Sequence, residues 1–422
     1  MAAQPSDSVA FSIYVKAKTV PSVTELDLYE LPIGEQCFAD DPDPHMLAAR
    51  ARHPWLAKSD FGIVVTEYNA CIEILMRDAQ LETPAAHIVE IMGGEGTNWA
   101  RFEVECLIAL AGADHDRIRA AARAAFSPRA VKSYQLRIQK VVLALLDEWA
   151  PMGRFDFEAF ASRFPVAVMF GLCGVSRARI PEVKDWLEIV GQSFCLDRRI
   201  FPQIRKGFDC LWEFVDGVVK DRKAHPQNGE ADLLDALIAT ESEGKINATE
   251  LRDLVLFLFV AGYDTSKNQL AHIMNFMLGR QEQWQRCASD RHYCDKVVDE
   301  ALRHSGVATS YRNVANEVEF RGITLPAGTM LIFPMGIVCR YSGPFENGLQ
   351  FDPDRPNANR HTAFSRGMHS CLGMFLAKLQ IAEGLHLIAR RLGNPRRDGE
   401  LVWRLFPGVW GPKRLPIAFE TL

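Results

Sequence analysis

The chain has 422 residues, of which 48% are hydrophobic and 24% charged, and its 48 basic and 53 acidic residues give a formal net charge of -5. This balance argues against a protein that binds nucleic acid or an anionic membrane. The longest apolar run, Leu254 to Tyr263, has ten residues, about half of the roughly 20 that cross a bilayer, so no membrane insertion is expected.

Apolar residues recur at helical spacing through most of the chain. The predicted helices lie near 68–77, 115–125, 130–149, 156–172, 181–194, 203–224, 247–278, 291–304 and 372–392. Strand signals are short: "FGIVVTE" predicts one strand, and "EVEFRGITLPAGTMLIF" predicts a hairpin turning at Arg321-Gly322 and then another strand. Without repeats or linkers, we expect one mainly α domain with a small β region over 1–422, with 1–40 as a peripheral segment.

The ten cysteines are scattered and form no C-x-x-C pair, which indicates a reduced protein. The first 20 residues also lack the basic leader and apolar core of a signal peptide. We therefore expect a cytoplasmic location.

One cysteine, Cys371, stands in the turn-rich stretch "AFSRGMHSCLG" directly before a predicted helix. The helix dipole and unpaired N–H groups at such a position favour an anion, which predicts a lowered thiol pKa and a thiolate. A thiolate is a strong electron donor to iron, and as an axial haem ligand it favours O–O bond cleavage. The alternative is a buried cysteine that packs as a small hydrophobe.

The predicted helix over 247–278 is interrupted by "AGYDTS". Gly262 costs roughly 1 kcal/mol relative to alanine inside a helix, so its presence calls for a reason. The Thr265 hydroxyl can bond the Ala261 carbonyl one turn earlier, and the small Ala261 and Gly262 leave room on that face. The alternative is an Asp-Thr pair that caps a break in the helix.

Two further pairs have helical spacing. Glu300 and Arg303 are three residues apart and can form an ion pair on one face. His115 and Arg119 are four apart, a geometry that can grip a carboxylate. Taken singly, each pair is more often solvent-exposed.

The stretch from Phe364 to Ala377, "FSRGMHSCLGMFLA", resembles the haem-binding signature of the cytochromes P450. Ser365 departs from the signature, which commonly has glycine there. The resemblance extends from about residue 60 to the end of the chain and implies the cytochrome P450 fold. The residues that match the signature are Phe364, Gly367, Cys371, Gly373, Leu376 and Ala377.

This resemblance implies that Cys371 is the axial ligand of the iron of haem b. It makes Asp264 and Thr265 a proton-handling acid–alcohol pair, and it adds Arg355 to Glu300 and Arg303 as a structural trio. Further implied haem contacts are Ala261, Phe364, Gly367 and Gly373, with His115, Arg119, Arg312 and His369 at the propionates. The implied substrate pocket comprises Val260, Ala261, Val307, Ala308 and Val409.

The expected function is a monooxygenase that inserts one oxygen atom of O2 into a hydrophobic small molecule. By resemblance, electrons come from NAD(P)H through a ferredoxin reductase and a ferredoxin, and the protein is a monomer. Residues 117–140 carry seven basic and no acidic side chains and are the expected docking surface for an acidic ferredoxin.

Other functions remain open at this stage. A P450-fold enzyme with peroxide-driven, coupling or rearrangement chemistry would keep Cys371 but often alter the Thr265 position. A haem protein that only binds a gas would need neither Asp264 nor Thr265. A cysteine hydrolase would need a base, and His369 lies too close along the loop to orient freely.

Overall fold

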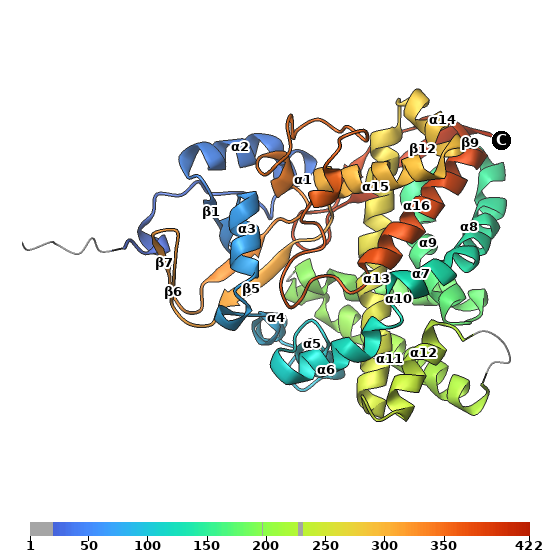
Figure 1. Cartoon of the computed structure of the whole chain (residues 1–422), viewed down its shortest axis with the longest axis horizontal. Helices are drawn as coiled ribbons and strands as arrows, with labels where there is room; N and C mark the ends of the chain where they lie inside the picture. Colours follow the sequence, from blue (N-terminus) through green and yellow to red (C-terminus); the bar gives the residue numbers. More distant parts are fainter. Residues whose placement is uncertain (1–19, 196, 227–230) are drawn as a thin grey trace, which may run out of the picture.

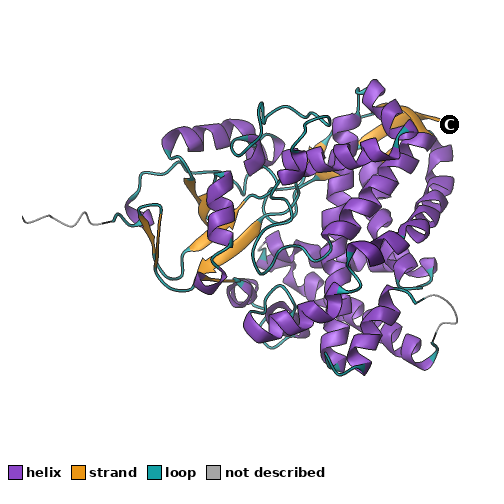
Figure 2. Cartoon of the chain, viewed as in Figure 1, coloured by secondary structure: helices purple, strands orange, loops and turns teal. Residues whose placement is uncertain are grey.

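The computed structural model describes residues 20–195, 197–226 and 231–422. Helices fill one side of the molecule and most strands gather on the other (Figures 1 and 2). The α-helices in these ranges are α1 (Gln36–Asp40), α2 (Asp43–Arg52), α3 (Tyr68–Leu75), α4 (Ala85–Met92), α5 (Asn98–Glu105), α6 (Gly112–Arg123), α7 (Pro128–Ser133), α8 (Gln135–Trp149), α9 (Phe157–Leu172), α10 (Ile180–Val190), α11 (Phe201–Ala224), α12 (Leu233–Ser242), α13 (Ala248–Met277), α14 (Gln281–Ser289), α15 (Arg291–Ser305) and α16 (Met374–Arg391). None of these helices is both long and apolar enough to span a lipid bilayer.

Several predicted helices differ from the observed ones at their boundaries. The single helix expected over 130–149 is two helices, because Ser127 caps α7 at Pro128 and the chain turns at Tyr134 before α8. Helices α1, α2, α4, α5, α12 and α14 were not predicted. Short 3-10 helices complete the helical structure: η1 (Val23–Glu25), η2 (Asp78–Gln80), η3 (Ala150–Met152), η4 (Arg177–Arg179), η5 (Gly191–Cys195), η6 (Arg198–Ile200), η7 (Val338–Arg340) and η8 (Ala358–Arg360).

The largest sheet has the strand order β1-β2-β8-β5-β3, in which only β2 and β8 are parallel. The predicted hairpin is confirmed as β6 and β7, and its turn residues Arg321 and Gly322 have positive φ angles of 50° and 74°, as a tight two-residue turn requires. The strands are β1 (Leu56–Ser59), β2 (Gly62–Val65), β3 (Leu81–Glu82), β4 (Arg154–Asp156), β5 (Ser310–Val314), β6 (Val318–Phe320), β7 (Ile323–Leu325), β8 (Met330–Phe333), β9 (Leu392–Arg397), β10 (Val402–Trp403), β11 (Pro412–Arg414) and β12 (Pro416–Thr421).

The segment expected to be peripheral, 1–40, lies partly outside the described residues, at 1–19. From residue 20 onward it contributes buried side chains to the small cores around the sheet. Val23 packs with residues of β8, and Leu31 and Phe38 pack near the C-terminal segment. The described part of this segment is therefore integrated into the β region.

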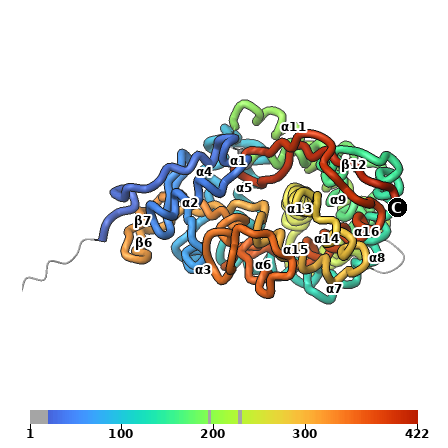
Figure 3. The backbone as a smooth tube through the Cα atoms, turned by 90° about the horizontal axis from the view of Figure 1, so that it is seen from above, coloured from blue at the N-terminus to red at the C-terminus, as the bar shows by residue number. Residues whose placement is uncertain are grey.

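Helix α13 is the axis of the helical side. Seen from above in Figure 3, it lies among α9, α15 and α16, and it packs against all three. Its start is fixed by a capping box, in which Asn247 Oδ1 accepts from Glu250 N at 2.9 Å and Glu250 Oε2 accepts from Asn247 N at 2.8 Å. This packing holds the middle of α13 at a fixed place beside α16.

A buried ion network joins α15 to the long loop before α16. The Glu300 carboxylate accepts from Arg303 at 2.7 and 2.8 Å, from Arg355 at 3.2 Å and from the Asp352 N–H at 2.8 Å. Glu300 and Arg303 are both fully buried. Arg303 also donates to the Gly348 carbonyl at 2.7 Å, so the network holds the irregular segment 341–357 between η7 and η8.

We expect Glu300→Gln to lower the free energy of unfolding by about 3–5 kcal/mol, because two buried guanidinium groups lose their counter-charge. Denaturant unfolding followed by circular dichroism measures the change. The control is Glu282→Gln on the exposed face of α14, which should cost less than about 0.5 kcal/mol. Equal losses in the two variants would contradict a bracing role for Glu300.

Candidate active site

The loop before α16 holds Cys371 by backbone hydrogen bonds. The Cys371 N–H donates to the Phe364 carbonyl at 2.9 Å, and the Met368 N–H donates to Asp78 Oδ2 at 2.9 Å. Gly367 has a φ angle of 75°, and a Cβ there would overlap the Leu75 carbonyl oxygen. Glycine is therefore required where the loop passes α3.

Ser365 is the position at which the sequence departs from the P450 signature. Its φ angle is 58°, in the left-handed region that favours glycine. The loop thus keeps a glycine-like backbone and accepts some strain at a serine. The serine also adds a hydroxyl-bearing side chain to the pocket wall.

The expectation of a lowered Cys371 pKa is wrong for the protein chain alone. Cys371 lies two residues before Gly373, the N-cap of α16, and its side chain is accessible from the pocket. Although the side chain is open to the pocket, the protein atoms packed around the sulfur desolvate it and raise the pKa of the thiol, while the Gly373 N–H and the Arg119 charge act in the opposite direction. A cysteine binds a metal as the thiolate, so a metal bound here would displace the thiol proton.

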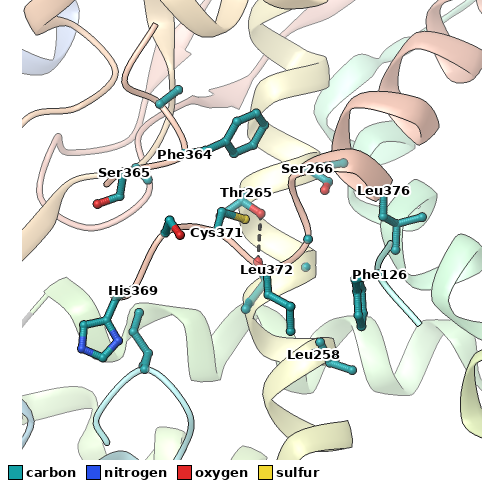
Figure 4. Close-up of a pocket in the computed structure, with 18 of the residues that line it drawn as sticks. Phe126, Leu258, Thr265, Ser266, Phe364, Ser365, His369, Cys371, Leu372 and Leu376 are labelled. Carbon is teal, nitrogen blue, oxygen red and sulfur yellow. Dashed lines mark hydrogen bonds between the residues drawn. The ribbon is translucent and has the colours of Figure 1, made fainter. Parts of the chain in front are cut away.

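Helix α13 presents Thr265 to the same pocket as Cys371 (Figure 4). The Thr265 hydroxyl donates to the Ala261 carbonyl at 2.8 Å, which confirms the bond predicted from the sequence. A Cβ at Gly262 would meet no atom within 4 Å, so this side of the helix faces open space. The small residues and the back-bonded hydroxyl form a shallow groove in the helix.

Asp264 does not line this pocket. Its carboxylate lies on another face of α13, where Oδ1 is 2.9 Å from Lys267 Nζ and 3.7 Å from Arg404 Nη1. Arg404 also reaches Glu158 at 3.0 Å and Glu188 at 3.1 Å, so α9 and α10 join the cluster. The acid and the alcohol that the sequence paired therefore point to different surroundings.

Leu107, Ile108, Phe126, Met169, Phe257 and Leu258 make much of the pocket wall apolar. Of the expected substrate residues, Ala261, Val307 and Ala308 line it. Val260 and Val409 are not among its lining residues in the described chain: Val260 packs into the helical core, and Val409 pairs with Ala308 through a β-bridge. Helical spacing explains the first difference, because Val260 is one residue away from the face of Ala261 and Thr265.

Four basic side chains converge beside the cysteine loop. The His115 and His369 rings are 5.0 Å apart, and Arg119 donates to the Ser370 carbonyl at 2.6 Å. Burial and the nearby Arg312, His115 and Arg119 charges lower the pKa of His369 to about 3, so its ring is neutral. Arg312 lines an adjoining cavity together with His369, and burial lowers its pKa to about 10.

The residues present fit a haem group. His115 is 1% exposed, and its Nε2 lies in the pocket wall without a hydrogen-bond partner, as a donor to a carboxylate would. Arg119 and Arg312 supply charge beside it. A Cβ at Gly373 or Gly262 would meet open space, which leaves room for a flat ring against Cys371. His115, Arg119, Arg312 and His369 would hold the propionates, and Cys371 the iron.

The polar pocket residues missed from the sequence include Ser266, Gln269 and Gln380. Gln269 lies one helical turn after Thr265, so spacing alone could have placed it on the pocket face. Gln380 comes from α16, and its meeting with α13 depends on tertiary packing that no local pattern reveals. Arg101 of α5 is not free to bind a substrate carboxylate, because it donates to the Asp253 carboxylate at 2.7 and 3.1 Å.

Comparison with known proteins agrees with this site. The Cytochrome P450 family profile matches residues 97–392. Luteothin monooxygenase of Streptomyces thioluteus is 30% identical over 409 residues, covering 96% of this chain and 98% of its own. The cytochrome P450 monooxygenase PikC of Streptomyces venezuelae is 30% identical over 320 residues, with 72% of this chain and 74% of PikC covered.

The fold is likewise that of solved P450 structures. The epothilone D-bound cytochrome P450epoK has a TM-score of 0.83 at 21% identity, covering 92% of this chain and 99% of the other. The chain therefore belongs to the cytochrome P450 family and is a haem monooxygenase, an oxidoreductase that incorporates oxygen.

Proposed function

We propose that the protein holds haem b through Cys371 and inserts one oxygen atom of O2 into a C–H bond of a hydrophobic small molecule. The observation that carries this proposal is that Cys371 and Thr265 face one pocket from two different elements (Figure 4). His115, Arg119, Arg312 and His369, beside the cysteine loop, support the binding of a haem with its two propionates. Residues 1–422 would act as a single domain, because both the helical side and the β region contribute to this pocket.

When bound, the haem supplies the activation of O2, and the thiolate donates electron density to its iron. Thr265 would hold and pass a proton beside the reacting oxygen. Ala261 and Gly262 leave space for that oxygen. The apolar walls exclude bulk water and so prevent side reactions. Phe364 and Gly367 would set the height of the cysteine loop under the ring.

The pocket walls support a hydrophobic substrate. Ile108, Leu258, Val307 and Ala308 offer apolar contacts, and few polar groups interrupt them on this side. Luteothin monooxygenase, which is similar along nearly its whole length, is named for luteothin. The presence of threonine at position 265 favours an O2-dependent reaction, because P450-fold enzymes with peroxide-driven chemistry often have another residue there.

For electron supply, we infer a ferredoxin that is reduced by NAD(P)H through a reductase. Arg123, Arg129 and Lys132 are exposed and form no ion pair with described residues. Arg119 of the same helix as Arg123 contacts the cysteine loop, and α7 packs against α16, so the basic surface lies near Cys371. The protein would work as a cytoplasmic monomer.

The spectrum of the reduced, CO-bound protein tests the coordination. We expect Cys371→Ser to shift the CO absorption band, because a serine oxygen is a much poorer donor to iron than a thiolate. Cys37→Ser, at an exposed cysteine, is the control and should keep the wild-type band. Coincident bands in Cys371→Ser and wild type would remove Cys371 as the ligand. In wild type, a screen of apolar compounds for spectral shifts would then narrow the substrate class.

We expect His115→Phe to lose haem about tenfold faster than wild type. The change keeps the ring and its burial but removes a hydrogen bond to a charged propionate, worth about 1.5–3 kcal/mol. Transfer of haem to an excess of an apo-globin acceptor measures the rate. His87→Phe on α4, at an exposed histidine, should match wild type, and equal rates in the two variants would argue against His115 as a propionate donor.

The basic surface predicts a salt-dependent electron transfer. Arg123→Glu combined with Lys132→Glu should slow reduction by a plant-type ferredoxin about tenfold at low ionic strength, because electrostatic steering is lost. The difference should fade as salt is added. Arg205→Glu combined with Lys206→Glu on α11 changes the charge by the same amount elsewhere. If both double variants show the wild-type salt dependence, the ferredoxin docks on another surface.

A further inference from the structure

A partly buried ion pair joins α5 to α13 beside the active-site pocket. Arg101 of α5 donates to both carboxylate oxygens of Asp253 of α13, from Nη1 to Oδ2 at 2.7 Å and from Nη2 to Oδ1 at 3.1 Å. The Asp253 side chain is only 9% exposed, so solvent screens the pair weakly, and Asp253 raises the pKa of the Arg101 guanidinium. A bidentate pair fixes the relative orientation of the two helices as well as their distance.

Each end of this pair adjoins residues of the pocket wall. Asp253 lies one helical turn before Phe257 on α13, and Phe257 lines the pocket. Arg101 lies in the second half of α5, and from the end of this helix the chain continues into Leu107 and Ile108, which also line the pocket. The ion pair therefore determines how far the wall formed by this segment stands from α13.

A second cavity adjoins the pocket at Leu107, which belongs to the walls of both. Its volume is about 230 Å3, and its other walls come from the 105–110 segment, from α6 and from the first turns of α13, where Asp253 is one of the lining residues. A cavity of about 150 Å3 can hold a benzene molecule, so this one has room for the side chain of a leucine. Leu107 is therefore a partition with space on both sides.

The segment between α5 and α6 is attached to α13 at two separate points. On the α6 side, Arg117 donates to the Glu250 carboxylate at 2.6 and 2.9 Å, so the position of α6 does not depend on Asp253. On the α5 side, the pair of Arg101 and Asp253 holds the end of the segment from which Leu107 follows. Loss of this pair alone should release Leu107 while α6 keeps its place beside the cysteine loop.

We propose that Asp253 is a positioning residue that limits the size of the substrate, because through Arg101 it holds Leu107 in the pocket wall. Without the pair, Leu107 retracts into the second cavity and the pocket accepts a longer apolar molecule. This inference rests on the proposed monooxygenase function. Arg101 faces the carboxylates of both Asp253 and Glu105, so it offers no uncompensated positive charge to an acidic molecule. The substrate class that fits this wall is neutral and apolar, with a length set by Leu107.

The test uses two azoles that bind haem iron through nitrogen and differ by one phenyl ring, phenylimidazole and biphenylylimidazole. Spectral titration of the haem-loaded protein gives the dissociation constant of each azole, and the ratio of the two constants reports the length of the pocket. Asp253→Asn and Arg101→Gln break the pair from either end, and Leu107→Ala removes the partition itself. The matched control is Arg117→Gln, which breaks the neighbouring pair between α6 and α13.

We expect Asp253→Asn to shift this ratio about tenfold in favour of biphenylylimidazole, because a hydrophobic pocket discriminates one small apolar group by about 10- to 200-fold. Arg101→Gln and Leu107→Ala should shift the ratio in the same direction. Asp253→Glu, which keeps the carboxylate, and Arg117→Gln should both stay near the wild-type ratio. Combining Asp253→Asn with Leu107→Ala should add nothing to Leu107→Ala alone, because both changes act through one side chain.

Three results would overturn the proposal: an unchanged ratio in Asp253→Asn and Arg101→Gln, additive shifts in the combined variant, or a crystal structure of Asp253→Asn in which Leu107 keeps its wild-type place. Arg101→Gln changes the more exposed end of the pair, so it keeps the test possible if Asp253→Asn does not fold. The CO-bound spectrum separates this failure from failure of the proposed function. If wild type gives the thiolate band while the ratio stays fixed in the variants, only the positioning role of Asp253 is refuted.

Discussion

The position of the Cys371 sulfur relative to the groove in α13 is the constraint on which the site depends. This relative position is fixed by two parts of the fold, the loop before α16 and helix α13. The loop before α16 is held to α3 through Asp78 and the close approach at Gly367. Helix α13 is held by its packing against α9, α15 and α16. A shift of about 1 Å in either would misplace the reacting groups by an amount that costs an enzyme roughly 100-fold in rate.

Much of this arrangement could be predicted from the sequence. Helical periodicity located α13 and α16, and the cysteine loop carried enough of the P450 signature to suggest the family. Thr265 was placed on the pocket face with the correct backbone bond, because that bond is local. The hairpin at Arg321-Gly322 was also correct, since two left-handed residues specify such a turn.

What could not be predicted depends on partners that are distant in sequence. The direction of Asp264 is decided by Lys267 and by Arg404, the latter 140 positions further along the chain. The pKa of Cys371 was expected to follow the helix dipole, but in the protein chain alone desolvation of the sulfur raises it more than the Gly373 N–H and the Arg119 charge lower it. The helices α4 and α5 were missed because they are short and are stabilised mainly by packing against the rest of the protein.

The middle of α13 shows why the fold retains costly polar residues. Six consecutive polar side chains, from Asp264 to Gln269, stand in a helix that is otherwise a core element. Apolar residues of similar size would stabilise such a core as well or better. Asp264 and Lys267 form a buried ion pair, and Ser266 accepts a hydrogen bond from Gln380, whereas the amides of Asn268 and Gln269 have no hydrogen-bond partner in the described chain. Of these two amides only Gln269 lines the pocket, so only its burial is explained by what the pocket must contain, as expected where stability is traded for activity.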